Sequence, residues 1–213
     1  MTSLADIETP FVAVDLDRVM RNIDRWQGYL DRHGIGNRPH IKTHKLVSLA
    51  RLQLEKGAMG IACQKLGEAE VMVEGLADRG PLDLMIPYNI LGNSKLQRAA
   101  ALSKQCRLTL ACDNEAMLLP MAQAMQAAGS EVGLVIEFDS GAGRCGVATI
   151  EEALALAKLA DSLPAIRFEG LMTYPPTGGA AKVRGFFEDA AAMLAESGIE
   201  TRIRSNGGSP DMW

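Results

Sequence analysis

The sequence predicts an α/β protein built as a (β/α)8 barrel of the TIM type. Short apolar or β-branched runs alternate along the chain with Ala- and Leu-rich segments of helical character. Strands that alternate with helices favour a parallel sheet. Each run also ends in polar residues, as expected at the C-terminal ends of barrel strands, where catalytic groups gather. The number of repeated units favours a barrel over a doubly wound sheet, although periodicity alone does not separate the two folds.

The pattern predicts a leading strand at residues 11–16 and a helix at residues 17–33 that ends at Gly34. Seven further strands are expected at residues 38–42, 59–64, 83–88, 107–112, 132–139, 167–173 and 201–206. Capping boxes at residues 94–97 and 149–152 indicate helix starts, and Gly129 and Gly198 indicate helix ends.

The 213 residues divide into two parts. Residues 1–36 form the leading strand and helix, and residues 37–213 form a barrel of about seven βα units that lacks its last strand. A barrel short of one strand has two open edges, which promote pairing with other chains. We therefore expect the chain alone to be poorly stable or to aggregate.

Charge and composition exclude several classes of function. Lys and Arg total 22 and Asp and Glu total 26, so the net charge is −4 and a nucleic-acid partner is not expected. Neither a signal peptide nor a membrane-spanning run is visible, so no membrane partner is expected. The four cysteines form no CxxC pair, which indicates reduced thiols in a cytoplasmic protein.

The segment His40-Ile-Lys42-Thr-His44 is the most informative motif. On a strand its two histidines and its lysine would share one face, and Lys42 would be semi-buried inside the barrel. Desolvation lowers the pKa of an amine and leaves more of the neutral form, which condenses with an aldehyde. Two alternatives stay open, a solvated basic patch and a metal site at His40 and His44, although no third ligand is evident.

A second motif, Ser205-Asn-Gly-Gly-Ser209, ends the last expected strand. A Gly-Gly turn flanked by hydroxyl groups exposes backbone N–H groups that can cradle a phosphate. Barrel phosphate sites often use the loops after strands seven and eight. An ordinary glycine turn is the alternative.

A third motif, residues 141–146, matches the pattern GxGxxG after a strand. The next helix begins near Thr149, after the third glycine, so the match does not favour nucleotide binding. We expect instead that Asp139 and Arg144 bracket a tight loop that aims the guanidinium into the site. A planar, permanently charged guanidinium suits an oxyanion or a phenolate.

Together these motifs resemble the alanine-racemase-type (fold type III) enzymes that use pyridoxal 5′-phosphate, and most closely the D-threonine aldolase and D-serine dehydratase family. The resemblance runs from residue 9 to the end of the chain. It rests on residues 38–45, 63–70, 139–147, 170–174 and 205–210, which occur in the family's order at the expected strand ends.

The resemblance implies that Lys42 carries the cofactor and is the catalytic residue. Lys45 would lie on the opposite strand face, so Lys42 is preferred. Arg144 would lie near the phenolic oxygen of the cofactor, and Gln64 and Tyr174 would border its ring. The phosphate would be held by Ser205, Asn206, Gly207, Gly208 and Ser209.

The family resemblance favours a pyridoxal-phosphate-dependent lyase that cleaves D-3-hydroxy amino acids to glycine and an aldehyde. A racemase, a D-serine dehydratase and a non-catalytic pyridoxal-phosphate-binding protein are the alternatives. Members of the family carry a C-terminal β domain that holds a divalent metal, and we expect neither that domain nor metal ligands in this chain. Part of the pocket for the small D-amino acid would then come from that domain or from a partner subunit in a homodimer.

Overall fold

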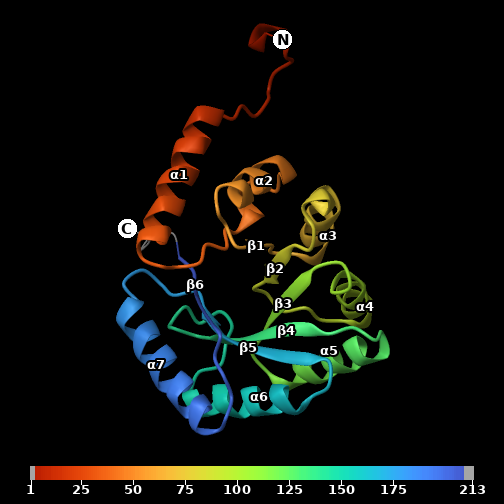
Figure 1. Cartoon of the computed structure of the whole chain (residues 1–213), viewed down its shortest axis with the longest axis vertical. Helices are drawn as coiled ribbons and strands as arrows, with labels where there is room; N and C mark the ends of the chain where they lie inside the picture. Colours follow the sequence, from red (N-terminus) through yellow and green to blue (C-terminus); the bar gives the residue numbers. More distant parts are fainter. Residues whose placement is uncertain (1–2, 209–213) are drawn as a thin grey trace.

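The computed structural model describes residues 3–208 and shows six parallel strands, whose order in the sheet follows their order in the chain. The sheet curls into a half-barrel, and helices cover its outer side (Figure 1). Its two edges are β1 and β6. The barrel-type α/β fold is confirmed, with six paired strands in the described part of the chain where seven were expected.

The strands are β1 (Ile61–Ala62), β2 (Asp83–Ile86), β3 (Arg107–Cys112), β4 (Val132–Phe138), β5 (Ile166–Thr173) and β6 (Ile203–Asn206). The α-helices are α1 (Leu16–Arg32), α2 (Val47–Glu55), α3 (Leu66–Gly75), α4 (Asn93–Leu102), α5 (Glu115–Ala127), α6 (Ile150–Ser162) and α7 (Ala180–Glu196). Three 3-10 helices are η1 (Leu4–Asp6), η2 (Ile41–Thr43) and η3 (Ala77–Arg79). Helices α3 to α7 each connect one strand to the next, as a parallel sheet requires.

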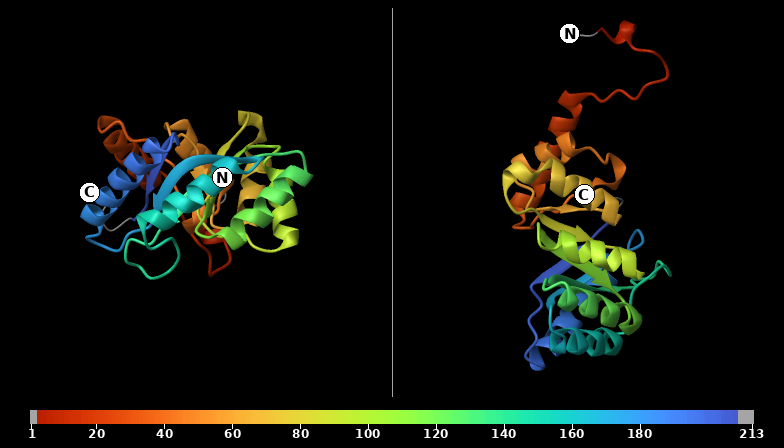
Figure 2. Two further views of the ribbon diagram at one scale, coloured as in Figure 1. Left: turned by 90° about the horizontal axis from the view of Figure 1, so that it is seen from below. Right: turned by 90° about the vertical axis from the view of Figure 1, so that its right-hand side faces the viewer.

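The expected leading strand at residues 11–16 is wrong. Residues 11–15 have no regular structure, and the segment projects away from the body of the molecule (Figure 2). Helix α1 begins at Leu16 because the Asp15 carboxylate accepts a hydrogen bond from the Arg18 N–H at 3.0 Å and caps the helix. The helix ends at Arg32 with Gly34 at a positive φ just beyond it, close to the predicted end.

The expected strand at residues 38–42 is reduced to one isolated bridge between His40 and Ala62. Pro39 has no N–H to donate, although its carbonyl accepts a hydrogen bond from the Ala62 N–H at 2.9 Å. The imidazole of His40 then accepts a hydrogen bond from the Lys42 N–H at 3.3 Å and starts the 3-10 helix η2. The chain therefore turns where the pattern predicted an extended strand.

Of the predicted helix boundaries, one start and both ends are confirmed, and one start is wrong. The capping box of Thr149 and Glu152 is confirmed, with both reciprocal hydrogen bonds in place. The box at Ser94 is wrong, because the N-cap of α4 is Gly92, two residues earlier, and makes no side-chain hydrogen bond. Gly129 and Gly198 follow α5 and α7 with positive φ angles, as predicted for helix ends.

The two faces of the sheet have different contents. The outer face packs apolar side chains against the helices, as in other βα folds. The inner face carries a small apolar layer that lies midway along the strands. It consists of Met85, Ala111, Val135 and Met172, with Ile203 packed against them.

Ion pairs fill the inner face at the N-terminal ends of the strands. Glu169 is buried, and its Oε1 accepts hydrogen bonds from Arg107 at 3.1 Å and Arg167 at 2.6 Å. Asp83 accepts a hydrogen bond from Arg38 at 2.7 Å in the same region. Buried charges are tolerated when they are paired in this way. The opposite, C-terminal end of the inner face is therefore where a ligand would bind.

Strand β5 contains a register shift against β4. Leu134 pairs with Phe168, but Val135 pairs with Gly170, so Glu169 has no counterpart in the ladder. Gly170 has a φ of 148°, and a Cβ at this position would overlap the backbone oxygen of Ile203. Only glycine lets β6 approach β5 at this point.

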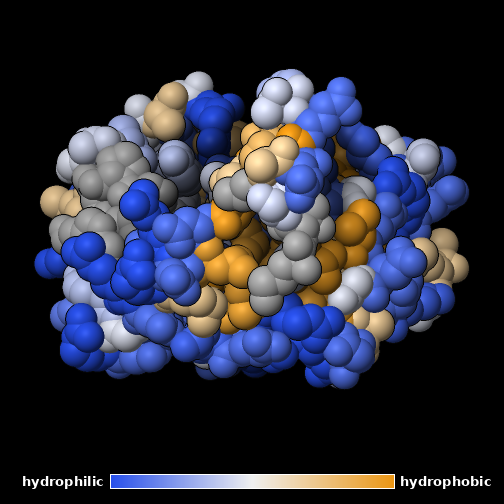
Figure 3. Space-filling model, turned by 90° about the horizontal axis from the view of Figure 1, so that it is seen from above, coloured by the Kyte–Doolittle hydropathy of each residue, from blue (hydrophilic) through white to orange (hydrophobic). Residues whose placement is uncertain are grey.

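No helix within residues 3–208 has the length and apolar character that crossing a bilayer requires. On the face seen from above in Figure 3, apolar side chains gather around a central hollow, and hydrophilic residues surround them. The leading segment also exposes large apolar side chains, namely Phe11, Val12, Val14 and Leu16. These side chains add to the apolar surface of the domain and not to its core.

Substituting Gly170→Ala is expected to lower the free energy of unfolding by at least about 2 kcal/mol, because the new methyl group meets the β6 backbone and φ is unfavourable. Gly185→Ala is the matched control, since Gly185 lies inside α7 with open space around it. That change should be neutral or raise stability by up to about 1 kcal/mol. Urea unfolding followed by circular dichroism measures both, and equal stability of the two variants would contradict the prediction.

Candidate functional site

A pocket of about 190 Å³ opens at the C-terminal ends of the strands. Its lining comes from both edges of the sheet and from the loops after β4 and β5. Eight of the nine residues predicted for cofactor binding line it, namely Lys42, Gln64, Arg144, Tyr174, Ser205, Asn206, Gly207 and Gly208. Ser209 lies outside the described residues. The structure thus brings together residues that lie far apart in the sequence.

Lys42 reaches this pocket from the 3-10 helix η2 and not from a strand. Its side chain is exposed, so the prediction of a semi-buried lysine is wrong. The reason is the turn at His40, which takes the lysine out of the inner face of the sheet. The Lys42 Nζ lies 5.4 Å from the centre of the Tyr174 ring, within the range of a cation–π contact.

Lys45, the competing lysine, is held elsewhere. Its Nζ forms an ion pair with Glu68 Oε1 at 3.1 Å, and Glu68 Oε2 accepts a hydrogen bond from the Gln64 N–H at 2.9 Å. Burial acts to raise the pKa of Glu68, but these hydrogen bonds and the charge of Lys45 lower it below its ordinary value. A carboxylate therefore retains Lys45, while Lys42 has no ion-pair partner within residues 3–208.

The two histidines do not share a face, which corrects the prediction. His40 lines the pocket, whereas His44 lies outside it and accepts a hydrogen bond from the Leu46 N–H at 3.1 Å. Within the described residues no group of three or more His, Cys, Asp or Glu side chains is placed to hold a metal ion.

His40 is a pocket residue that the sequence argument did not select. Burial, and next the positive charge of Lys42, lower its pKa from 6.5 to about 4. Nδ1 accepts the hydrogen bond from the backbone, so the neutral ring carries its proton on Nε2. This Nε2 is buried and makes no hydrogen bond of good geometry within residues 3–208, although the Gln64 side chain lies close enough to the ring to act against the lowering of its pKa. His40 caps the 3-10 helix η2, but this segment was predicted as a strand, so the capping role was not visible in the sequence.

Arg144 is presented by a tight loop, as predicted. The Asp139 Oδ1 accepts hydrogen bonds from the backbone N–H groups of Gly141 at 2.9 Å and Gly143 at 3.1 Å. These hydrogen bonds lower the pKa of Asp139, and the bond from Gly141 has the largest effect. The Arg144 guanidinium carbon lies 5.0 Å from the centre of the Tyr174 ring. Helix α6 begins after the third glycine, unlike a dinucleotide-binding turn.

The predicted phosphate loop follows β6 at the rim of the pocket. The Gly207 N–H donates a hydrogen bond to the Thr173 carbonyl at 3.1 Å, so this N–H is not exposed as predicted. A Cβ at Gly207 would lie 3.0 Å from the Tyr174 ring, tighter than most real contacts. Ser205 and Asn206 line the pocket beside it.

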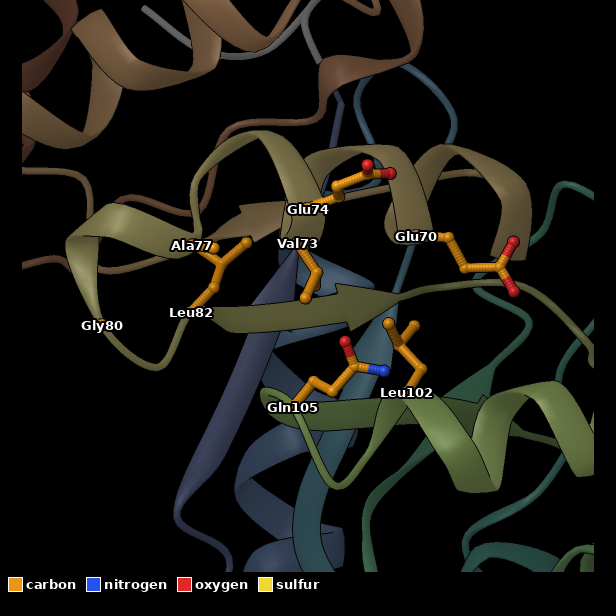
Figure 4. Close-up of a pocket in the computed structure, with 8 residues that line it drawn as sticks. All are labelled: Glu70, Val73, Glu74, Ala77, Gly80, Leu82, Leu102 and Gln105. Carbon is orange, nitrogen blue, oxygen red and sulfur yellow. The ribbon is translucent and has the colours of Figure 1, made fainter.

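A second pocket, of about 480 Å³, lies between α3 and α4, near the N-terminal ends of β2 and β3 (Figure 4). Glu70 at its border is bound to Arg98, with Nε and Oε1 2.8 Å apart. The lining contains no Lys, His, Ser or Cys. Although larger, this pocket has no amine, imidazole, hydroxyl or thiol side chain for nucleophilic chemistry, and of its two carboxylates Glu70 is bound to Arg98.

The lowered pKa of His40 predicts a pH dependence of stability. The unfolded chain binds a proton at His40 near pH 6.5, whereas the folded chain does so only near pH 4. Stability is therefore lost as the pH falls from about 6.5 to about 4, by on the order of 1 to 2 kcal/mol after allowing for solvent screening. Denaturant unfolding at several pH values should show this loss in the wild type and less of it in His40→Gln.

His33→Gln, a change at an exposed position on the chain leaving α1, is the control and should keep the wild-type slope. An unchanged slope in His40→Gln would show that His40 does not titrate in this way.

The chain is similar to several known proteins. A D-threonine aldolase of Arthrobacter sp is 35% identical over 219 aligned positions, which cover 97% of this chain and 56% of that protein. A 3-hydroxy-D-aspartate aldolase of Paracoccus denitrificans (strain Pd 1222) is 35% identical over 192 positions, covering 89% of this chain and 48% of that protein. The chain spans about half the length of the curated relatives that it matches.

The crystal structure of D-threonine aldolase from Filomicrobium marinum superposes with a TM-score of 0.88 at 29% identity, over 97% of this chain and 58% of that one. Residues 14–213 match the family described as "Alanine racemase, N-terminal domain". The half-barrel, the lysine at its C-terminal end and the match over nearly the whole chain lead to one conclusion. This chain belongs to the alanine racemase N-terminal domain family.

Proposed function

We propose that this chain forms the cofactor-binding part of a pyridoxal-phosphate-dependent lyase that cleaves D-3-hydroxy amino acids to glycine and an aldehyde. The observation that carries the proposal is Lys42, an amine without an ion-pair partner among the described residues that reaches the pocket beside Tyr174 and Arg144. The names of the aldolases to which the chain is similar support the choice of reaction.

The pocket suits an anionic aromatic aldehyde such as pyridoxal phosphate. Lys42 and Arg144 supply two cations next to one aromatic ring. The buried Nε2 of His40 carries a proton and lies near Gln64, which also lines the pocket. At Gly207 a side chain would crowd the Tyr174 ring, so the glycine keeps this wall of the pocket clear.

The residues selected from the sequence then have proposed roles. Lys42 would hold the cofactor covalently through Nζ, and Arg144 would donate hydrogen bonds to its phenolic oxygen. Tyr174 and Gln64 would border the ring. The phosphate would be bound at the end of β6 by Ser205, Asn206, Gly207, Gly208 and Ser209. Since the Gly207 N–H is already bonded to Thr173, the contact with the phosphate would come from other groups of this loop.

The bound cofactor supplies an electron sink that stabilises negative charge at Cα of the substrate. The protein chooses which bond breaks by orienting the substrate and by taking a proton from a particular atom. Removal of the proton from the β-hydroxyl group favours carbon–carbon cleavage, and removal of the Cα proton favours dehydration or racemisation. A divalent metal and part of the substrate pocket would come from outside residues 3–208, from a further domain or from a second subunit. The free cysteines fit a cytoplasmic location.

Borohydride reduction of the protein with pyridoxal phosphate should place a permanent label on Lys42. Lys42→Ala is expected to reduce labelling to background, because Lys42 is the only lysine among the described residues that line the pocket. Lys45→Ala is the matched control and should label normally, since Lys45 is bound to Glu68. Peptide mapping identifies the site. A label on Lys45, or none anywhere, would overturn the assignment.

Incubating the protein with D-threonine, pyridoxal phosphate and a divalent cation tests the reaction itself. Glycine is the expected product, with Lys42→Ala at least about a hundredfold slower because the covalent anchor is gone. Separate assays for 2-oxobutanoate and for L-allothreonine, the product of inversion at Cα alone, distinguish the dehydratase and racemase alternatives. Cofactor absorbance without turnover would indicate a non-catalytic binding protein.

A further inference from the structure

One acidic residue of the half-barrel lies close to the pocket without lining it. Glu137 interrupts the otherwise apolar strand β4 and has a side chain only 2% exposed. It pairs in register with Met172 of the inner apolar layer. A carboxylate in such a place costs free energy unless a partner compensates it. Its contacts therefore indicate why an acid is present there.

The partners of Glu137 come from the Arg144 loop. Oε1 accepts a hydrogen bond from Arg144 Nη2 at 3.3 Å and lies 3.2 Å from the Cys145 Sγ. Oε2 is buried without a partner in the described part of the chain. Glu137 thus commits its charge to this one arginine and its neighbour.

The backbone fixes the same loop at its base. The Val147 N–H donates to the Glu137 carbonyl at 2.8 Å, and the Asp139 N–H donates to the Val147 carbonyl at 2.9 Å. The Gly146 N–H donates to the Asp113 carboxylate at 2.9 Å. These bonds position the loop but leave the long Arg144 side chain free to rotate. Its guanidinium is held by Glu137 and by the face of Tyr174, a ring that is itself 39% exposed.

The charges agree with this geometry. Burial acts to lower the pKa of Arg144, but Cys145 and the charge of Glu137 outweigh it, so the pKa is raised and the guanidinium remains a cation. One of its five N–H donors is used by Glu137 and Cys145 lies close by, so the guanidinium keeps further donors for a ligand.

We propose that Glu137 is a positioning residue that holds the Arg144 guanidinium over Tyr174, with its remaining donors directed at an anionic oxygen in the pocket. This inference rests on the proposed function, in which that oxygen is the phenolic oxygen of pyridoxal phosphate. Glu137 itself touches neither cofactor nor substrate and acts only through Arg144.

A double-mutant cycle on pyridoxal phosphate affinity tests the proposal. Glu137→Gln should weaken binding about fivefold to tenfold, the effect of one half-exposed charged hydrogen bond. In an Arg144→Gln background the same change should have no further effect. Glu169→Gln is the matched control, since Glu169 is equally buried on the next strand but holds Arg107 and Arg167 at the far end, and it should change affinity less than twofold. Equal losses in both backgrounds, no loss at all, or the same loss for Glu169→Gln would overturn the proposal.

A second measurement needs no cofactor and separates this inference from the proposed function. In the cofactor-free protein, the Arg144 Nη2–H groups, which Glu137 binds, should exchange with solvent several-fold faster in Glu137→Gln than in the wild type, with backbone amide exchange unchanged. Unchanged side-chain exchange would overturn the role of Glu137. Failure of the wild type to bind pyridoxal phosphate covalently would instead overturn the proposed function. The exchange measurement would still test whether Glu137 positions Arg144.

Discussion

Successive side chains of a strand point to opposite faces of its sheet, and β5 breaks this alternation at Gly170. Before the break, Glu169 points into the half-barrel and binds Arg107 and Arg167. After the break, Met172 lies in the inner apolar layer, three residues after Glu169. Strict alternation would instead place residues two and four positions after Glu169 on that face. The extra residue therefore turns Tyr174 towards the pocket, where Arg144 and Lys42 meet its ring. Without the shift, Tyr174 would face the helices, and the pocket would lose the surface that both cations share.

Two acidic residues near the site make the cations there unequal, because each acid forms an ion pair with one of them. Glu68 binds Lys45 and holds the start of α3 through the Gln64 N–H. Glu137 binds Arg144 from within the sheet. Lys42 is left with an aromatic ring and no carboxylate among its described neighbours. An amine that is not engaged in an ion pair is available for covalent chemistry, whereas its neighbour three residues away is not.

Much of the fold could be predicted from the sequence, because strands β2 to β5 are apolar runs with clear boundaries. The failures have local causes. Pro39 and the capping imidazole of His40 convert an apparent strand into a turn, which also makes Lys42 exposed. Glu137 is a single acidic residue in an otherwise apolar strand, and the sequence does not show its partner because only the folded loop brings Arg144 next to it. A register shift such as that at Gly170 changes no residue type, so periodicity does not show which face Tyr174 occupies.

The pocket also depends on the curl of the sheet, because its walls come from opposite edges. Lys42 and Gln64 lie next to β1, and Ser205 and Asn206 lie on β6, five strands away in sheet order. Hydrogen bonds along the ladder determine the spacing of neighbouring strands but not the distance between the two edges. A ligand that contacts both edges binds the curled form and not a flatter one, so its binding free energy adds to the stability of the curl. Ligand binding in the pocket and curling of the sheet are therefore thermodynamically coupled.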